Sequence, residues 1–221
     1  MPFPPPRTIL FDLDGTLTDP EEGILGCIGH ALRRLGRDVP APEALRWCVG
    51  PPLQESFARL LRTDDLSHAW EAVGLYRERY REQGLYECRV YSGVPELLAE
   101  LRSGGRRLYV ATSKPTVFAE RVLEHFRLAE HFDGVFGCEL DGTRSNKGEL
   151  ISHLLSESGI DPAGAVMVGD RKHDVLGAAR SGVPAVGVTY GFGSVEELRI
   201  AGAAALCASP SALSGLLTNR L

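Results

Sequence analysis

Two aspartates, Asp12 and Asp14, stand one residue apart near the start of the chain, directly after the apolar run Ile9-Leu10-Phe11. Because side chains alternate along a strand, both carboxylates lie on the same side if the chain stays extended, and Gly15 allows it to turn away afterwards. Two acids held so close together are costly unless a positive charge lies between them. The pattern predicts a cation-binding strand end that distant residues must complete.

The residues that could complete it depend on an alternation of strand and helix patterns in the second part of the chain. The predicted strands are 106–111, 134–137, 165–168, 185–188 and 204–207, and the predicted helices after them are 115–126, 147–158, 173–181, 195–201 and 211–217. Apolar strands without a polar face are typical of a parallel sheet that helices cover on both sides. We therefore predict an α/β fold, whose binding site lies at the carboxyl ends of the strands.

Polar side chains follow two of these strands and begin one of the helices. Thr112 and Ser113 follow the first strand of this series, just before a predicted helix start, where a hydroxyl and free amides can bind an anion. Asp170 follows the third strand after a glycine that permits a sharp turn, and Asp174 lies four residues further on. Lys147 stands at a helix start, where a lysine is unfavourable for the helix dipole unless a phosphate lies nearby.

This set of side chains indicates phosphoryl chemistry. Carboxylate oxygens in such number favour a hard cation, and Mg²⁺ in particular, because it takes few protein ligands and keeps several waters. A carboxylate can attack phosphorus and form an aspartyl phosphate, which divides one difficult step into two. Asp12 is the predicted nucleophile, and Asp14 is the predicted acid that protonates the leaving alcohol and then the base that activates water. We expect Asp12, the backbone carbonyl of Asp14 and Asp170 to hold Mg²⁺.

The other polar residues are expected to serve the phosphoryl group. Thr112, the Ser113 amide and Lys147 are predicted to bind its oxygens as charge shifts during the reaction. Asp174 is predicted to act through a metal-bound water or by orienting Lys147. The histidines have no spacing typical of zinc ligands, so we expect no zinc site.

Residues 19–88 contain helical patterns and no convincing strand, so they interrupt the alternation directly after the first strand. We predict a core domain of residues 1–18 and 89–221, and an inserted α-helical cap domain of residues 19–88. Asp19 is the predicted cap of the first inserted helix, a simpler interpretation than a metal ligand.

A rigid loop interrupts the helical block at Gly50, Pro51 and Pro52. Such a loop is by itself an ordinary connection between helices. In a cap domain it also becomes a candidate for substrate selection, and we predict that role for these residues and for Arg46.

The motifs resemble, in order along the chain, the four motifs of the haloacid dehalogenase superfamily. They are Asp12-Leu13-Asp14-Gly15-Thr16, Val110-Ala111-Thr112-Ser113, Lys147, and Gly169-Asp170 with Asp174. The helical insertion resembles the cap of the phosphoglycolate-phosphatase-like branch, whereas residues 139–150 look more like a subgroup often labelled 5′-nucleotidase or simply phosphatase. The resemblance implies a Rossmann-like core, a mobile α-helical cap, Mg²⁺, and hydrolysis of phosphate monoesters such as phosphoglycolate or nucleoside monophosphates.

Alternatives remain within and outside this superfamily. β-Phosphoglucomutases have nearly the same motifs, so a phosphotransferase is an alternative to a phosphatase. A phospho-accepting signalling domain or a non-catalytic binding protein would also bring acids to a parallel sheet. Dehalogenases lack an acid two residues after the nucleophile, unlike Asp14, and phosphonatases need a cap lysine, which residues 19–87 do not contain.

Composition excludes several other classes of protein. The net charge of −5 argues against nucleic acid or an anionic membrane as the main partner, so we expect a small phosphorylated metabolite as the partner of a monomer or homodimer. The five scattered cysteines fit a reducing cytoplasm better than a disulfide framework. Residues 1–6 are proline-rich, so we expect no signal peptide, and we find no apolar stretch of the roughly 18 residues that a membrane span needs.

Overall fold

The computed structural model describes residues 5–218, which form two compact units. One unit contains the chain up to Asp19 and again from Val90 onward, and the other contains Pro20–Arg89. Each border lies one residue after the predicted domain border. Residues 1–4 of the proline-rich start, for which no signal peptide is expected, lie outside the described residues. No helix within residues 5–218 has both the length and the apolar character that crossing a bilayer requires.

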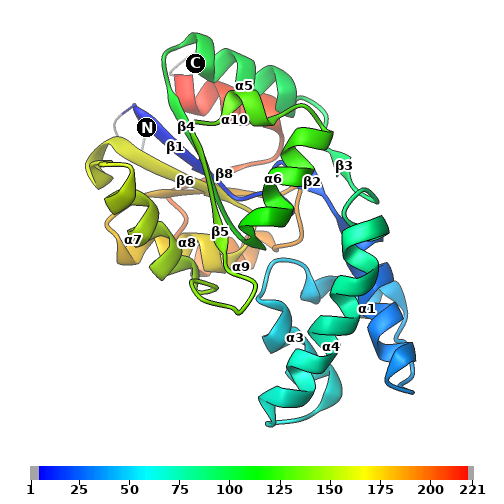
Figure 1. Cartoon of the computed structure of the whole chain (residues 1–221). Coiled ribbons are helices and arrows are strands. Elements are labelled where there is room, and N and C mark those ends of the chain that lie inside the picture. The colour runs from blue at the N-terminus through cyan, green and yellow to red at the C-terminus, as the bar shows by residue number, and fades with distance from the viewer. Residues whose placement is uncertain (1–4, 219–221) are drawn as a thin grey trace. The chain divides into compact units, whose positions relative to one another are not determined.

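The first unit is built on a six-stranded parallel sheet with the strand order β5-β4-β1-β6-β7-β8 (Figure 1). The strands are β1 (Thr8–Phe11), β4 (Arg107–Pro115), β5 (Gly134–Cys138), β6 (Ala165–Gly169), β7 (Ala185–Val188) and β8 (Ala205–Cys207). Strands β1 and β6 are buried along their whole length, which explains why they carry no alternating polar face. The predicted α/β fold with a Rossmann-like parallel sheet is confirmed.

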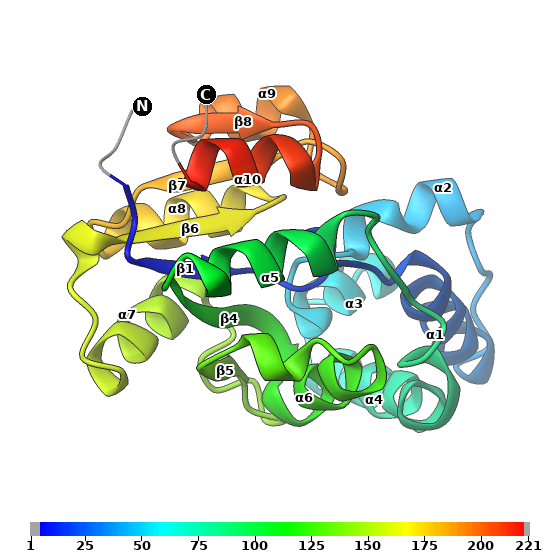
Figure 2. The ribbon, with the colours of Figure 1, turned by 90° about the horizontal axis from the view of Figure 1, so that it is seen from above.

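Helices cover both faces of this sheet, as the apolar strands predict. They are α5 (Val94–Ser103), α6 (Thr116–His125), α7 (Lys147–Glu157), α8 (Lys172–Arg180), α9 (Val195–Ile200) and α10 (Pro210–Thr218). On one face, side chains of α7, α8 and α9 pack with Leu10, Ala111 and Met167 into one buried core. Helices α5 and α10 lie side by side on the opposite face (Figures 1 and 2). This packing holds the carboxyl ends of β4, β1 and β6 next to one another.

Strand β4 continues four residues beyond its predicted end and includes Thr112, Ser113, Lys114 and Pro115. The predicted helix 115–126 is present as α6 but begins one residue later, so Thr112 and Ser113 lie inside the strand and further from the helix start than predicted. Proline disfavours helical backbone at the residue before it, so Lys114 stays extended and α6 begins only at Thr116. The pairing of β4 with β5 resumes at Pro115 after a register shift.

The second unit is helical. Its elements are α1 (Glu21–Arg34), α2 (Pro42–Leu45), the 3₁₀-helix η1 (Arg46–Cys48), α3 (Leu53–Leu61), α4 (Leu66–Arg79) and the π-helical turn η2 (Tyr80–Gly84). Aromatic rings fill its core, where Tyr76 stacks on Tyr80 and meets Phe57 edge-on. The unit can therefore bury its own apolar surface with helices alone.

The prediction that Asp19 caps the first of these helices was wrong. Helix α1 begins at Glu21, and the residue before it, Pro20, is the N-cap and makes no side-chain capping bond. Asp19 instead belongs to the short strand β2 (Thr18–Asp19), which pairs with β3 (Arg89–Val90). The backbone of Asp19 is held in this two-stranded sheet, so the helix begins only after Pro20.

Candidate active site

Three buried carboxylates meet at the carboxyl end of the sheet. Asp12 follows β1, while Asp170 and Asp174 follow β6, and one oxygen of each lies within 4.8 Å of the others. All three residues are at most 4% exposed. Carboxylates that are brought so close together repel one another and lose hydration, so they need a cation among them. The side chain of Asp14 is not part of this triad and instead pairs with Lys114.

Lys147 supplies one such cation. Its ammonium group lies 2.8 Å from Asp12 Oδ1, 2.8 Å from Asp174 Oδ1 and 2.9 Å from the carbonyl oxygen of Ala111. The contacts with Asp12 and Ala111 are hydrogen bonds, and the contact with Asp174 is an ion pair. The side chain of Asn146 caps helix α7 just before Lys147 by accepting from two backbone N–H groups, which fixes where the helix begins. Lys147 therefore holds the carboxylates of β1 and α8 together.

A second buried lysine, Lys114, was not among the predicted site residues. Its Nζ lies 2.5 Å from Asp14 Oδ1, and both residues are at most 8% exposed. The sequence could have indicated Lys114 as a site residue, because side chains two apart on a strand share a face and Lys114 follows Thr112 by two residues. The chain contains three lysines, and two of them, Lys114 and Lys147, are buried at this edge of the sheet.

Thr112 and Ser113 lie within β4 rather than at a helix start. Thr112 is buried beside β1, and its hydroxyl accepts a bond of 3.2 Å from the backbone N–H of Lys114. The carbonyl of Ser113 accepts from the thiol of Cys138 on the neighbouring strand β5. These contacts stabilise the extended conformation of residues 112–114, which puts the Thr112 hydroxyl at the sheet edge that Asp12 also occupies.

The segment after β7 is a further part of the site that sequence reasoning missed. The backbone N–H of Phe192 donates to Asp170 Oδ2 at 2.7 Å, and the hydroxyl of Tyr190 donates to the carbonyl of Thr16 at 3.0 Å. Strand β7 was predicted correctly, and the rule that binding residues follow strands points to this segment. Residues 189–194 carry no charged side chain, and the contact to Asp170 is made by a backbone group. The residue types therefore did not indicate that this segment belongs to the site.

The carboxylate cluster fits a divalent cation. Asp170 Oδ1 is buried and has no hydrogen-bond partner within residues 5–218, so this oxygen has an acceptor site that a cation could fill. Three carboxylates within reach of one point match the all-oxygen ligand sets that Mg²⁺ prefers. The cluster includes the side chain of Asp174 beside Asp12 and Asp170, whereas the predicted ligands were Asp12, the backbone carbonyl of Asp14 and Asp170.

Burial changes the proton affinities of these groups. Burial, together with the neighbouring Asp12 and Asp174, raises the pKa of Asp170 well above its usual range. Burial also raises the pKa of Asp174 to about 6, against the opposing effect of Lys147. For Lys147, burial alone would lower the pKa, but Asp12 and Asp174 raise it above its usual value, so the group stays charged. A cation bound among the acids would favour their ionised forms.

Burial likewise raises the pKa of Asp14, with the ion pair to Lys114 as the main opposing effect. A carboxyl group that readily holds a proton is suited to donate one to a leaving group. The two acids of the first motif therefore have separate environments, since Asp12 contacts Lys147 and Asp14 contacts Lys114.

Residues 9–188 match the model of a family described as haloacid dehalogenase-like hydrolase. The chain belongs to this family. The predicted family and enzyme class are thereby confirmed, and the predicted motifs all fall within the matched residues.

Known proteins similar to this haloacid dehalogenase-like hydrolase act on phosphoryl groups according to their names. A 5′-nucleotidase of Pseudomonas aeruginosa is 52% identical over 96% of this chain and 95% of its own. The tyrosine-protein kinase PtkA of Mycobacterium tuberculosis is 41% identical over 86% of this chain, which spans 65% of that protein. The crystal structure of a predicted phosphatase from Clostridium acetobutylicum superimposes with a TM-score of 0.94 at 42% identity, covering 97% of this chain and 99% of the other.

The predicted substrate-selecting residues of this hydrolase lie in its helical unit. Arg46 begins η1 and is paired with Glu21 at 2.9 Å, and both side chains are partly exposed. Gly50 has a φ of 105°, a backbone conformation that favours glycine, and Pro52 directly precedes α3. Pro51 lies between them in the same bend.

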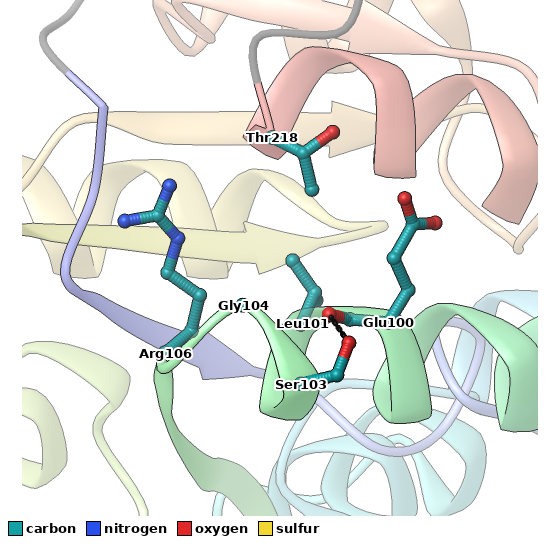
Figure 3. Close-up of a pocket in the computed structure, with 6 residues that line it drawn as sticks. All are labelled: Glu100, Leu101, Ser103, Gly104, Arg106 and Thr218. Carbon is teal, nitrogen blue, oxygen red and sulfur yellow. Dashed lines mark hydrogen bonds between the residues drawn. The ribbon is translucent and has the colours of Figure 1, made fainter.

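A pocket of about 210 Å³ lies in the unit that contains the six-stranded sheet, at the end of the sheet opposite the carboxylate cluster (Figure 3). It is lined by Glu100, Leu101, Ser103, Gly104, Arg106 and Thr218. Arg106 directly precedes β4, so this pocket is at the amino end of the strands. It contains none of the motif residues of the family and has no part in the chemistry considered below.

Proposed function

We propose that this hydrolase removes phosphate from small phosphate monoesters in an Mg²⁺-dependent reaction through an aspartyl phosphate on Asp12. The observation that carries the proposal is the buried cluster in which Asp12 lies against the Lys147 ammonium and close to the carboxylates of Asp170 and Asp174. Bound Mg²⁺ would neutralise the clustered charge and polarise the phosphoryl group. The remaining chemistry falls to the side chains of the chain itself.

In the first step, Asp12 attacks phosphorus while Asp14 donates a proton to the leaving alcohol. Asp12 is suited to the attack because β1 is rigid and Lys147 holds the carboxylate in place. In the second step, Asp14 accepts a proton from the water that attacks the aspartyl phosphate, which releases phosphate and restores Asp12. Thr112, the Ser113 amide and Lys147 are proposed to bind the phosphoryl oxygens.

A direct test uses p-nitrophenyl phosphate, whose leaving group reports turnover by absorbance. We expect hydrolysis in the presence of Mg²⁺, complete loss of activity after treatment with EDTA, and recovery when Mg²⁺ is added back. Turnover that persists in EDTA-treated protein would contradict the metal dependence, and absence of turnover with every phosphate ester tested would contradict the proposed function.

Among phosphate monoesters, we propose nucleoside monophosphates as the favoured class over phosphoglycolate. Support comes from the similarity to a protein named 5′-nucleotidase at 52% identity along nearly the whole chain. We expect kcat/KM for nucleoside 5′-monophosphates to exceed that for phosphoglycolate by at least about tenfold, the size of effect that a few specific contacts give. A ratio in the other direction would reverse the assignment of substrate class.

We further propose that Arg46 and the loop Gly50-Pro51-Pro52 contribute to the choice of substrate. Replacing Pro51 and Pro52 by alanine should change the ratio of kcat/KM values across a panel of metabolite phosphates. The turnover of p-nitrophenyl phosphate, which offers few groups to recognise, should change less. An identical substrate profile would contradict this role of the loop.

Lys114 is proposed to position the acid Asp14, since its Nζ contacts that carboxylate at 2.5 Å. Replacing Lys114 with methionine should lower kcat by about 10–100-fold, part of what a positioned acid contributes, and leave metal affinity within about twofold of the wild-type value. Lys114→Arg should recover part of kcat because it keeps a cation there. The matched control is Lys172→Met, which removes the exposed third lysine and should leave kcat unchanged.

A reducing cytoplasm remains the proposed location. The five cysteines, four of them buried, form no disulfide among the described residues. A monomer or a homodimer is the proposed state in solution, and the mass of the native protein in light scattering would distinguish the two.

A further inference from the structure

The carboxylate of Asp170 lies in a cradle of backbone groups from two separate segments. Gly15, which belongs to the first motif, comes so close that a Cβ atom there would lie 2.3 Å from Asp170 Oδ2. A Cβ at Gly191 would lie 2.5 Å from Asp170 Cβ, and a Cβ at Gly193 would lie 1.9 Å from the carbonyl oxygen of Asp170. An added Cβ at Gly191 would also lie 2.3 Å from the carbonyl oxygen of Gly15. The clashes at Gly191 and Gly193 therefore include backbone atoms, which cannot be relieved by turning a side chain, so these two positions require glycine. Gly15 has a φ of 91°, a backbone conformation that favours glycine.

The same segment also makes a directed contact to the carboxylate. The backbone N–H of Phe192 donates to Asp170 Oδ2 at 2.7 Å, which leaves Oδ1 as the oxygen that has no donor within residues 5–218. The two oxygens of Asp170 therefore differ, because one is fixed by the protein and the other is available to a cation. Partners behind a metal ligand commonly fix its orientation in this way.

The segment is itself anchored on both sides. Tyr190 donates from its hydroxyl to the carbonyl of Thr16 at 3.0 Å, and its ring meets that of Tyr91 edge-on at 5.0 Å between centroids. The backbone N–H of Tyr91 in turn donates to the carbonyl of Leu17 at 3.1 Å. Residues 189–193 are thus tied to the chain that leaves the first motif, so they have little freedom to move away from Asp170.

We propose that Gly191 and the backbone N–H of Phe192 are positioning elements for the metal ligand Asp170, which they hold with Oδ1 directed into the carboxylate cluster. The inference rests on the proposed metal site and concerns a segment that contributes no ligand of its own. It assigns to residues 190–193 a function in metal affinity, in addition to the motif residues of the family.

Metal affinity measured without turnover tests this role. The probe is Mn²⁺ added to metal-free protein, followed by the EPR signal of the free ion. Gly191→Ala should weaken Mn²⁺ binding by about 10–100-fold, the range found when partners of metal ligands are removed. The matched control is Gly164→Ala just before β6, where an added Cβ meets no atom within 4 Å, and this variant should bind Mn²⁺ within about twofold of wild type.

A second pair of variants keeps the test decisive if Gly191→Ala does not fold. Phe192→Pro removes the N–H that donates to Asp170, whereas Phe192→Leu keeps it and changes only the side chain. We expect weakened Mn²⁺ binding in the proline variant alone, with both variants folded by circular dichroism. Wild-type affinity in folded Gly191→Ala or Phe192→Pro would overturn the inference. Failure of the wild-type protein to bind Mn²⁺ would instead contradict the metal site itself.

Discussion

Replacing Asp12 with asparagine is expected to lower the rate of phosphate-ester hydrolysis by at least about 10⁴-fold, as loss of a covalent nucleophile does in other enzymes. An amide cannot form the acyl phosphate, so neither half of the reaction can proceed through residue 12. The measurement is kcat for p-nitrophenyl phosphate at saturating Mg²⁺, with circular dichroism to confirm folding.

Folding should survive this change. The variant loses the ion pair between Asp12 and Lys147, but it also relieves the repulsion among the three clustered acids, and Lys147 keeps its contact with Asp174. The matched control is Asp141→Asn, because Asp141-Gly142-Thr143 repeats the end of the first motif in an exposed turn. The control should retain full activity. An Asp12→Asn protein with undiminished kcat would contradict the nucleophile assignment.

Replacing Lys147 with methionine is expected to remove activity and also to destabilise the fold. The change leaves Asp12 and Asp174 buried without their common cation, and removal of one partner of a buried ion pair costs about 3–5 kcal/mol of unfolding free energy. The free energy of unfolding in urea measures the first effect. The loss of kcat should be at least about 10²-fold, the size found when one donor to a developing charge is removed.

Mg²⁺ offers a further check on this variant. A cation bound among the acids can replace part of the missing charge, so added Mg²⁺ should stabilise Lys147→Met more than it stabilises the wild-type protein. Lys172→Met again serves as the control, since its side chain is exposed. Equal stability of Lys147→Met and the wild-type protein without metal would show that the buried ion pairs contribute nothing.

The sequence predicts this sheet well because its strands are short apolar runs with no competing pattern. Strand β7 was predicted with its observed bounds, Ala185–Val188, and the rule about carboxyl ends led directly to Asp12, Thr112 and Asp170. The rule works because it depends on topology, and a strictly parallel sheet brings those ends to one edge.

The errors and omissions have two sources. Two helices begin one residue later than predicted, at Glu21 and at Thr116, and Asp19 and Lys114, which precede these starts, belong to strands. The mistaken helix start also hid Lys114, whose side chain follows Thr112 on the same face of β4. The contribution of Phe192 is a backbone N–H, which every residue except proline possesses, so residue type gives no signal for it.

The most direct test of the proposed mechanism is chemical identification of the phosphorylated residue. Asp14→Asn should form the aspartyl phosphate from p-nitrophenyl phosphate, whose leaving group needs no proton, and should hydrolyse it slowly for want of the base. After acid quench, reduction with borohydride converts an acyl phosphate to an alcohol, which peptide mass spectrometry locates. We predict homoserine at position 12. Reduction at any other residue, or none while substrate is being consumed, would contradict the mechanism.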